Sequence, residues 1–331
     1  MAITLAEAKV GMADKVDQQV VDMFRRSSLL LDRMTFDDSI SPGTGGSTLT
    51  YGYVQLSTPA TAAVRTINTE YTANEAKREK KTTNAIVMGG SFQIDRVIQN
   101  TSGAIDELTF QAEQKIKATA NYFHNVAING TSAATGAGYV TGTFDGLRKL
   151  LNGTSNVITS EVSLTSSAEM TSNYAAFLDE LDAFISCIDG KPDMLMMNSK
   201  MLNRLRGCAR RAGYYERSRD DFGRVVETYN GIALLDAGQY YNGTNSVDVV
   251  GTSAATSSAA GKTDIFAICL GLDAFHGISP LGGGLINSYL PDLTQPGAVK
   301  KGEVELVAGV ALKNTLKAAQ LTGISILPKT T

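Results

Sequence analysis

The sequence has very few of the residues that most often build catalytic and metal sites. Only two histidines and three cysteines occur among its 331 residues. His124 and His276 stand far apart, and neither belongs to the His-Glu-x-x-His or Cys-x-x-Cys spacing that holds zinc. We therefore expect no catalytic residues, no bound cofactor and no metal site.

The cysteines also argue against a disulfide framework. Cys187, Cys208 and Cys269 are odd in number, widely spaced and set in apolar or helical contexts. Such cysteines are typical of a protein from a reducing compartment. We expect three buried, free thiols.

Long hydrophobic runs are missing as well. No apolar run approaches the roughly 18 residues that span a bilayer, and the N-terminus lacks the basic and apolar regions of a signal peptide. We expect no membrane partner and a cytoplasmic origin. An apolar content of 43% in 331 residues is enough for a large core, and this length exceeds the roughly 250 to 300 residues at which cores tend to divide. Two subdomains are therefore expected.

One motif imitates a nucleotide site. Ala260–Thr263 ends like a phosphate-binding loop, but the position of the first required glycine is Thr256. The following segment, Asp264–Leu270, has a strand pattern where a phosphate-binding loop needs a helix. We therefore reject nucleotide binding here.

A strand is predicted at Ile86–Asp95, where large apolar residues recur with a period of two. This alternation is typical of a strand with one buried face. Gly89 and Gly90 interrupt it, and a glycine pair inside a strand predicts a bulge or a bend.

A second extended segment, Thr48–Tyr53, precedes this strand. The stretch 58–83 between the two has few large apolar residues and many charges, so it cannot build a core of its own. We expect a hairpin over 48–98 that projects from the body and rests on a neighbouring subunit. The residues assigned to the contact at its tip are Glu70, Glu75, Lys77, Arg78, Lys80 and Lys81.

A long amphipathic helix is predicted over about 103–129. Apolar residues recur at steps of three and four from Ile105 to Ala127, and charged residues lie off that stripe. Ser102 is the predicted N-cap, and Asn129-Gly130 is the predicted left-handed stop.

The first 47 residues predict a helix followed by turns. Thr4 and Glu7 have capping-box spacing, and an apolar face runs from Leu5 to Phe24. The sequence leaves open whether this helix extends as an arm or packs on its own domain.

Positive charge is concentrated after the middle of the chain. Such a patch can meet nucleic acid phosphates. Because Asp220 and Asp221 lie alongside and the net charge is only -3, a salt-bridged contact with an adjacent subunit is favoured over a dedicated nucleic-acid site. The residues assigned to this subunit or DNA contact are Arg204, Arg206, Arg210 and Arg211.

The order of these elements resembles the major capsid proteins of tailed bacteriophages, with the Hong Kong 97 type of fold. In that family an N-terminal arm leads into an extended hairpin, a spine helix in a peripheral domain, an axial domain, and a late return to the peripheral domain. Tyr174–Ile188, Pro192–Asn198 and Lys200–Ala212 resemble the helix, strand and helix of the axial domain, and Val304–Ile326 resembles the closing segment.

The resemblance implies an α+β fold with four parts. These are an N-terminal arm (1–47), an extended hairpin loop (48–98), a peripheral domain (99–160 and 299–331) and an axial domain (161–298).

It also implies a non-enzymatic subunit that associates with itself into pentamers and hexamers of an icosahedral head. The implied partners are a portal protein, non-specifically packaged double-stranded DNA, and a scaffolding protein, expected to be separate because no long segment precedes the arm. The implied location is the virion, after assembly in the host bacterial cytoplasm. Two alternatives stay open: an encapsulin-like shell that packages protein, and an enzyme with a site built from scattered carboxylates and serines.

Overall fold

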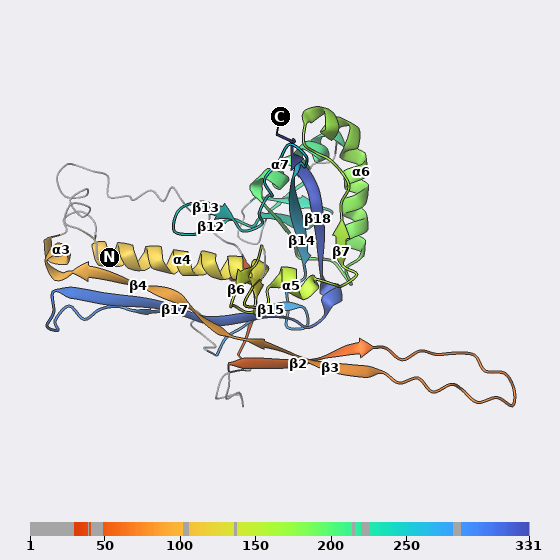
Figure 1. Cartoon of the computed structure of the whole chain (residues 1–331), viewed down its shortest axis with the longest axis horizontal. Coiled ribbons are helices and arrows are strands. Elements are labelled where there is room, and N and C mark those ends of the chain that lie inside the picture. Colours follow the sequence, from red (N-terminus) through yellow and green to blue (C-terminus); the bar gives the residue numbers. More distant parts are fainter. Residues whose placement is uncertain are drawn as a thin grey trace.

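The protein has a mixed α+β architecture, with two sheets, a long helix and a projecting hairpin (Figure 1). The computed structural model describes residues 30–38, 40, 49–101, 106–135, 138–213, 216–219, 225–280 and 286–330. The predicted N-terminal helix lies outside these ranges. In the described part of the chain, no helix has the length and apolar character needed to cross a membrane.

The first sheet has five strands built around one long strand, β17. β17 pairs in antiparallel fashion with β15, β16 and β4, and β15 also pairs in parallel with the short β1. The strands are β1 (Phe36–Asp37), β4 (Ile86–Asp95), β15 (Phe275–Ile278), β16 (Ile286–Tyr289) and β17 (Val299–Leu312).

The strand predicted at β4 is confirmed, with Met88, Phe92 and Ile94 buried on one face. Of the two irregularities predicted at its glycine pair, the bulge is wrong, because β4 pairs with β17 without a register shift along its whole length. A Cβ atom on Gly89 would overlap the carbonyl oxygen of Val304. The glycine is therefore required by the close approach of two strands.

The predicted long helix is α4 (Glu107–Asn129), preceded by the short α3 (Arg96–Thr101). α4 lies along β4 and β17 (Figure 1), where its Ala112 packs with Phe92 of the sheet. Its final turns, from Phe123 onward, are buried completely. The predicted N-cap, Ser102, lies outside the described residues.

The helix ends at Asn129 as predicted, but the predicted left-handed stop is wrong. Gly130 has a φ of -66° and a ψ of 153°, which is extended backbone. A Cβ atom at this position would lie 2.5 Å from the carbonyl oxygens of Val126 and Phe144. Glycine is required there because three backbone segments meet, and not because of its φ angle.

The second sheet has seven strands in the order β7-β18-β14-β8-β11-β10-β9. Helices α6 and α7 pack on the same face of this sheet. Each begins at a residue, Ser166 or Asn198, whose side chain accepts a backbone N–H. The helix, strand and helix predicted in this part of the chain are thus confirmed. The elements are β7 (Val157–Thr159), α6 (Ser167–Ser186), β8 (Met194–Met197), α7 (Ser199–Arg211), β9 (Glu216–Arg219), β10 (Val225–Tyr229), β11 (Ile232–Asp236), β14 (Gly261–Ile268) and β18 (Ala318–Leu327).

Both faces of the seven-stranded sheet are buried, and strand β8 shows why. Its side chains alternate, so that Leu195 and Met197 join the core beneath α6 and α7, while Met194 and Met196 face the opposite side. The core on this opposite side of the sheet also contains Phe123 of α4 and residues of β17. The two sheets are therefore joined by one continuous core.

Short elements fill the junction between the sheets. Helix α5 lies between α4 and β18, and the small hairpin of β12 and β13 packs on α4. These elements are α2 (Leu30–Arg33), β5 (Gly130–Thr131), β6 (Val140–Thr141), α5 (Leu147–Leu151), β12 (Gln239–Tyr241), β13 (Ser246–Asp248) and η3 (Thr315–Lys317).

Candidate functional site

The most prominent surface feature is a hairpin that projects far from the rest of the chain (Figure 1). It consists of β2 (Thr50–Thr58) and β3 (Lys77–Asn84), which pair in antiparallel fashion. Every residue of the connecting tip, 59–76, is exposed. No core of its own supports this tip, as its composition predicted.

The structure corrects how the hairpin is built. The strand at 86–95 was expected to be its second arm, but that strand belongs to the five-stranded sheet, and β3 pairs with β2 instead. Of the residues assigned to the tip, Glu70 and Glu75 lie there. The other four, Lys77, Arg78, Lys80 and Lys81, lie in strand β3.

One face of the hairpin combines apolar and basic side chains. Val54 stands opposite Lys80, and Leu56 stands opposite Arg78, so all four project to the same side. Val54 is 64% exposed and Leu56 is 61% exposed. Tyr71 in the tip is exposed as well. Apolar side chains gathered on a projecting element are typical of a protein–protein contact.

The base of the hairpin is attached firmly to the body. Tyr51 and Tyr53 are buried in a small core against the five-stranded sheet. The side-chain amide of Gln55 donates to the carbonyl oxygens of Leu312 and Lys313, at 3.1 and 2.7 Å. The hairpin is therefore fixed at its base and unsupported at its tip.

Tyr51 is the centre of a polar cluster at this base. Its hydroxyl donates to Asp37 Oδ2 at 3.0 Å, and the ammonium of Lys313 lies 5.5 Å from the centre of its ring. His276 packs edge-on against the same ring, with the two ring centres 5.8 Å apart. Burial raises the pKa of the Tyr51 hydroxyl, which therefore stays a hydrogen-bond donor at neutral pH.

The arginine cluster predicted near the middle of the chain lies on α7. Arg204 donates to two backbone carbonyls, Arg206 pairs with Glu227 at 2.6 Å, and Arg211 donates to a carbonyl of its own helix and to hydroxyls of α6. Arg210 is exposed. Three of the four arginines thus have partners within the subunit.

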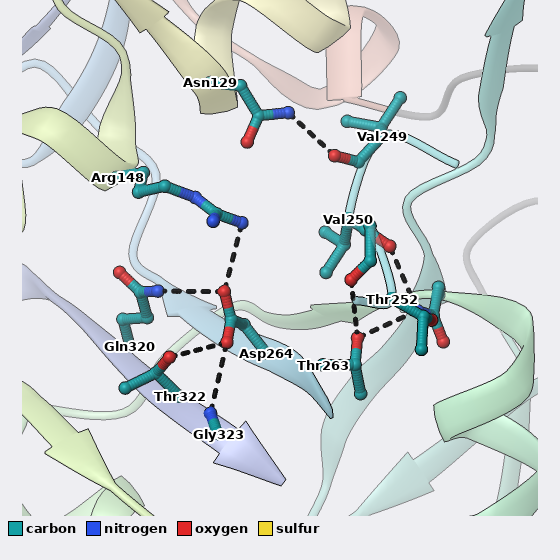
Figure 2. A network of polar contacts seen from close by, with 12 residues as sticks. Asn129, Arg148, Val249, Val250, Thr252, Thr263, Asp264, Gln320, Thr322 and Gly323 are labelled. Atoms are coloured by element: carbon teal, nitrogen blue, oxygen red, sulfur yellow. Dashed lines mark hydrogen bonds and ion pairs between the residues drawn. The ribbon is translucent and has the colours of Figure 1, made fainter. Parts of the chain in front are cut away.

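A second polar cluster lies between helix α5 and the seven-stranded sheet (Figure 2). The carboxylate of Asp264, on β14, accepts from Arg148 of α5 at 3.0 Å and from Gln320, Thr322 and the Gly323 backbone at 2.6 to 3.2 Å. This cluster was not predictable from the sequence, because its members are far apart in the chain and resemble ordinary surface residues.

Two asparagines add further connections between the segment before β14 and its neighbours. Asn129, the last residue of α4, donates to the carbonyl oxygen of Val249 at 2.7 Å. Asn198 donates to the carbonyl oxygen of Val250 at 3.0 Å and to the hydroxyl of Thr263. These bonds fix the segment before β14 against both α4 and the second sheet.

We predict that Asp264→Asn lowers the free energy of unfolding by about 2 kcal/mol, since hydrogen bonds to a charged group contribute roughly 1.5 to 3 kcal/mol. The substitution leaves the guanidinium of Arg148 half-buried without its anion. Urea denaturation of the unassembled subunit measures the change. Asp292→Asn is the matched control, because Asp292 is exposed and bonds only locally. An equal loss in both variants would contradict the prediction.

The described residues contain no group of three His, Cys, Asp or Glu side chains that could hold a metal ion. Cys208 and Cys269 are buried and free, and burial raises the pKa of Cys208 to about 11. Cys187 is free but exposed, so the expectation that all three are buried is wrong. Strand β14 begins at Gly261, so the strand predicted over Asp264–Leu270 is confirmed and starts earlier than predicted.

Comparison with known proteins points to one family. A family model described as SU10 major capsid protein matches residues 14–232, more than half of the chain. No curated protein sequence matches.

Solved structures are similar over nearly the whole length of both chains. The SrpI encapsulin complex of Synechococcus elongatus PCC 7942 matches at 12% identity with a TM-score of 0.63, covering 100% of this chain and 99% of the other. A structure from Mycobacterium phage Ogopogo matches at 13% identity and 0.56, covering 97% and 99%. Mycobacterium phage Bobi matches at 12% and 0.55, covering 100% of both chains. At such identities the likeness concerns the fold.

Proposed function

The chain belongs to the SU10 major capsid protein family, and on that premise we propose that its copies form the pentamers and hexamers of an icosahedral phage head. Membership of this family makes it a structural, non-enzymatic component of the virion. Such a shell requires the chain to associate with itself. Each contact needs only a modest affinity, because it is repeated around a closed ring and over many rings.

The observation that carries this proposal is the projecting hairpin. Its tip is exposed throughout, and the face that carries Val54 and Leu56 is uncovered within the subunit. The basic residues Arg78 and Lys80 lie beside these apolar side chains. An apolar strip flanked by charges suits a contact in which burial supplies affinity and charge fixes register. We assign the hairpin, from tip to β3, to the contact with an adjacent copy.

The two sheets suggest how the chain is divided. We assign α4 and the five-stranded sheet to the peripheral domain, and the seven-stranded sheet with α6 and α7 to the axial domain. This assignment changes the boundaries predicted from sequence. β15 and β16 pair with β17 in the first sheet, whereas β18 pairs with β14 in the second.

Further partners follow from the function of a phage head. We propose that it encloses double-stranded DNA without sequence specificity, assembles with a separate scaffolding protein and joins a portal protein. Of the predicted arginine cluster, Arg210 is the side chain best placed for a subunit or DNA contact. The other three would first have to leave partners within the subunit.

An encapsulin-like shell is the second candidate, favoured by the likeness to the SrpI encapsulin over the whole chain. A phage head and an encapsulin shell differ in what they enclose. Extraction of purified particles separates them, because a phage head packages nucleic acid and an encapsulin packages protein.

Assembly itself is the test of the proposed function. We expect the purified protein to form closed particles or ring-shaped capsomers, alone or with its scaffolding protein. Light scattering at high concentration and negative-stain electron microscopy measure this. A subunit that stays monomeric under both conditions would rule out the shell.

A further inference from the structure

The base of the hairpin contains a buried histidine with an unused ring nitrogen. His276 lies in strand β15 and is fully buried. Its Nδ1 is 3.3 Å from the carbonyl oxygen of Ala274, while Nε2 has no hydrogen-bond partner among the described residues. Most buried polar atoms in proteins are hydrogen-bonded, so an exception calls for an explanation.

The position of this ring connects it to the attachment of the hairpin. Its edge-on contact is with Tyr51, the residue of β2 whose hydroxyl bonds to Asp37. Tyr51 is one of the side chains that cover His276, so moving it off the sheet would expose part of the imidazole ring. The imidazole is thus buried when the hairpin is seated and meets water when the base of the hairpin lifts.

The charged and titratable groups around His276 come from each element packed on it. They are Asp37 of β1, Tyr51 of β2, Lys313 after β17 and Asp273 before β15. Burial lowers the pKa of His276, and the positive charge of Lys313 adds to this effect, although both carboxylates oppose it. With the hairpin seated, His276 is therefore neutral at pH 7.

The direction of the pH effect follows from the difference between the pKa of His276 in the seated hairpin and its pKa in the lifted hairpin. A lifted hairpin returns His276 to water, where a histidine has an ordinary pKa near 6.5. The lifted state therefore binds a proton at a higher pH than the seated state does. As the pH falls below about 6.5, the equilibrium moves toward the lifted state.

We propose that His276 is a proton-sensitive hinge residue, which holds the hairpin base on the sheet when neutral and releases it when protonated. The consequence for shells rests on the proposed function, because the hairpin is there assigned to the contact between copies. Mild acid would then change the orientation of that contact while leaving the two sheets intact.

Hydrogen exchange of the unassembled, full-length subunit between pH 7.5 and 5 tests the hinge. After correction for intrinsic exchange, protection in 49–58 and 77–85 should fall below pH 6.5 by up to about tenfold per pH unit. His276→Phe keeps a ring against Tyr51 but cannot titrate, so its hairpin protection should not depend on pH. Lys313→Met removes a cation that opposes protonation of the seated state, so it brings the pKa of seated His276 closer to that of the lifted state and should reduce the pH response.

The chain offers a matched control in its other histidine. His124 is buried in α4, away from the hairpin, and His124→Phe should keep the pH response of 49–58. If His276→Phe does not fold, His276→Gln and Lys313→Met still test the hinge. The proposal is overturned if wild type and the His276 variant share one pH profile, or if protection is lost equally throughout the chain. If the protein forms shells but its hairpin shows no pH-dependent exchange, the hinge alone is refuted. If the hairpin shows this pH dependence but the protein forms no shells, the proposed function alone is refuted.

Discussion

Replacing residues 57–77 by an Asn-Gly turn is expected to abolish shell assembly and leave the subunit folded. Leu56 and Arg78 are paired directly across the two strands, so a two-residue turn can join them. The segment removed is exposed throughout, which means that its loss takes almost nothing from the subunit's core. Because closure of a loop has only a logarithmic cost in length, stability should stay within about 1 kcal/mol of the original.

The loss of assembly has a separate physical cause. The tip presents Val64, Ile67 and Tyr71 to solvent, and the contact with an adjacent copy would lose this apolar area. Electron microscopy and circular dichroism of the same preparation measure the two effects. A full-length variant with these three residues changed to serine is the control for loop length, and should assemble poorly. Normal assembly of the shortened variant would show that the tip is dispensable for shell formation. Unfolding of the shortened variant would show that the tip belongs to the core of the subunit.

Phe266→Ala is expected to lower the free energy of unfolding by about 3 to 5 kcal/mol, the usual cost of removing a fully buried aromatic ring. Phe266 lies in the core shared by the two sheets, and the guanidinium of Arg148 lies 5.7 Å from its ring centre. The cavity therefore weakens both sheets at once.

Because the core is continuous, unfolding should remain one cooperative transition at a lower denaturant concentration. Circular dichroism gives the overall transition, and hydrogen exchange in β17 and in β8 tests the sheets separately. Phe266→Leu, which keeps most of the buried volume, should cost roughly 1 kcal/mol. Two separate transitions would mean that the sheets are independent units.

Local patterns in the sequence predicted the elements that carry their own apolar faces. The alternation in β4 and the stripe along α4 were visible in the chain, whereas α6, β8 and α7 were expected from the family resemblance. In β4 and α4 the buried side chains recur with the period of the backbone. Such a signal needs no knowledge of the partner.

Strand β3 could not be predicted from apolar periodicity. Its residues, Lys77–Asn84, are exposed except for Thr83, so it has no apolar alternation to recognise. It is a strand because its backbone pairs with β2. Because backbone pairing leaves no mark on the side-chain pattern, the sequence also could not show that β4 pairs with β17, which lies far along the chain.

The candidate site was predictable in part. A projecting, poorly apolar segment was visible from composition, whereas the face formed by Val54 and Leu56 with Arg78 and Lys80 depends on register. The base of the hairpin was not predictable, because His276, Tyr51 and Asp37 come from three distant segments. Their arrangement follows from how the strands are paired in three dimensions.

The sequence by itself determined which segments have a buried face, where the long helix ends, and that one exposed stretch builds no core. These properties depend on neighbours within a few residues. Only the tertiary structure decided which strands pair, why Gly89 and Gly130 are glycines, and which arginines are engaged within the subunit. The physical reason is that packing and hydrogen bonding act between atoms close in space, and that closeness is set by the whole fold.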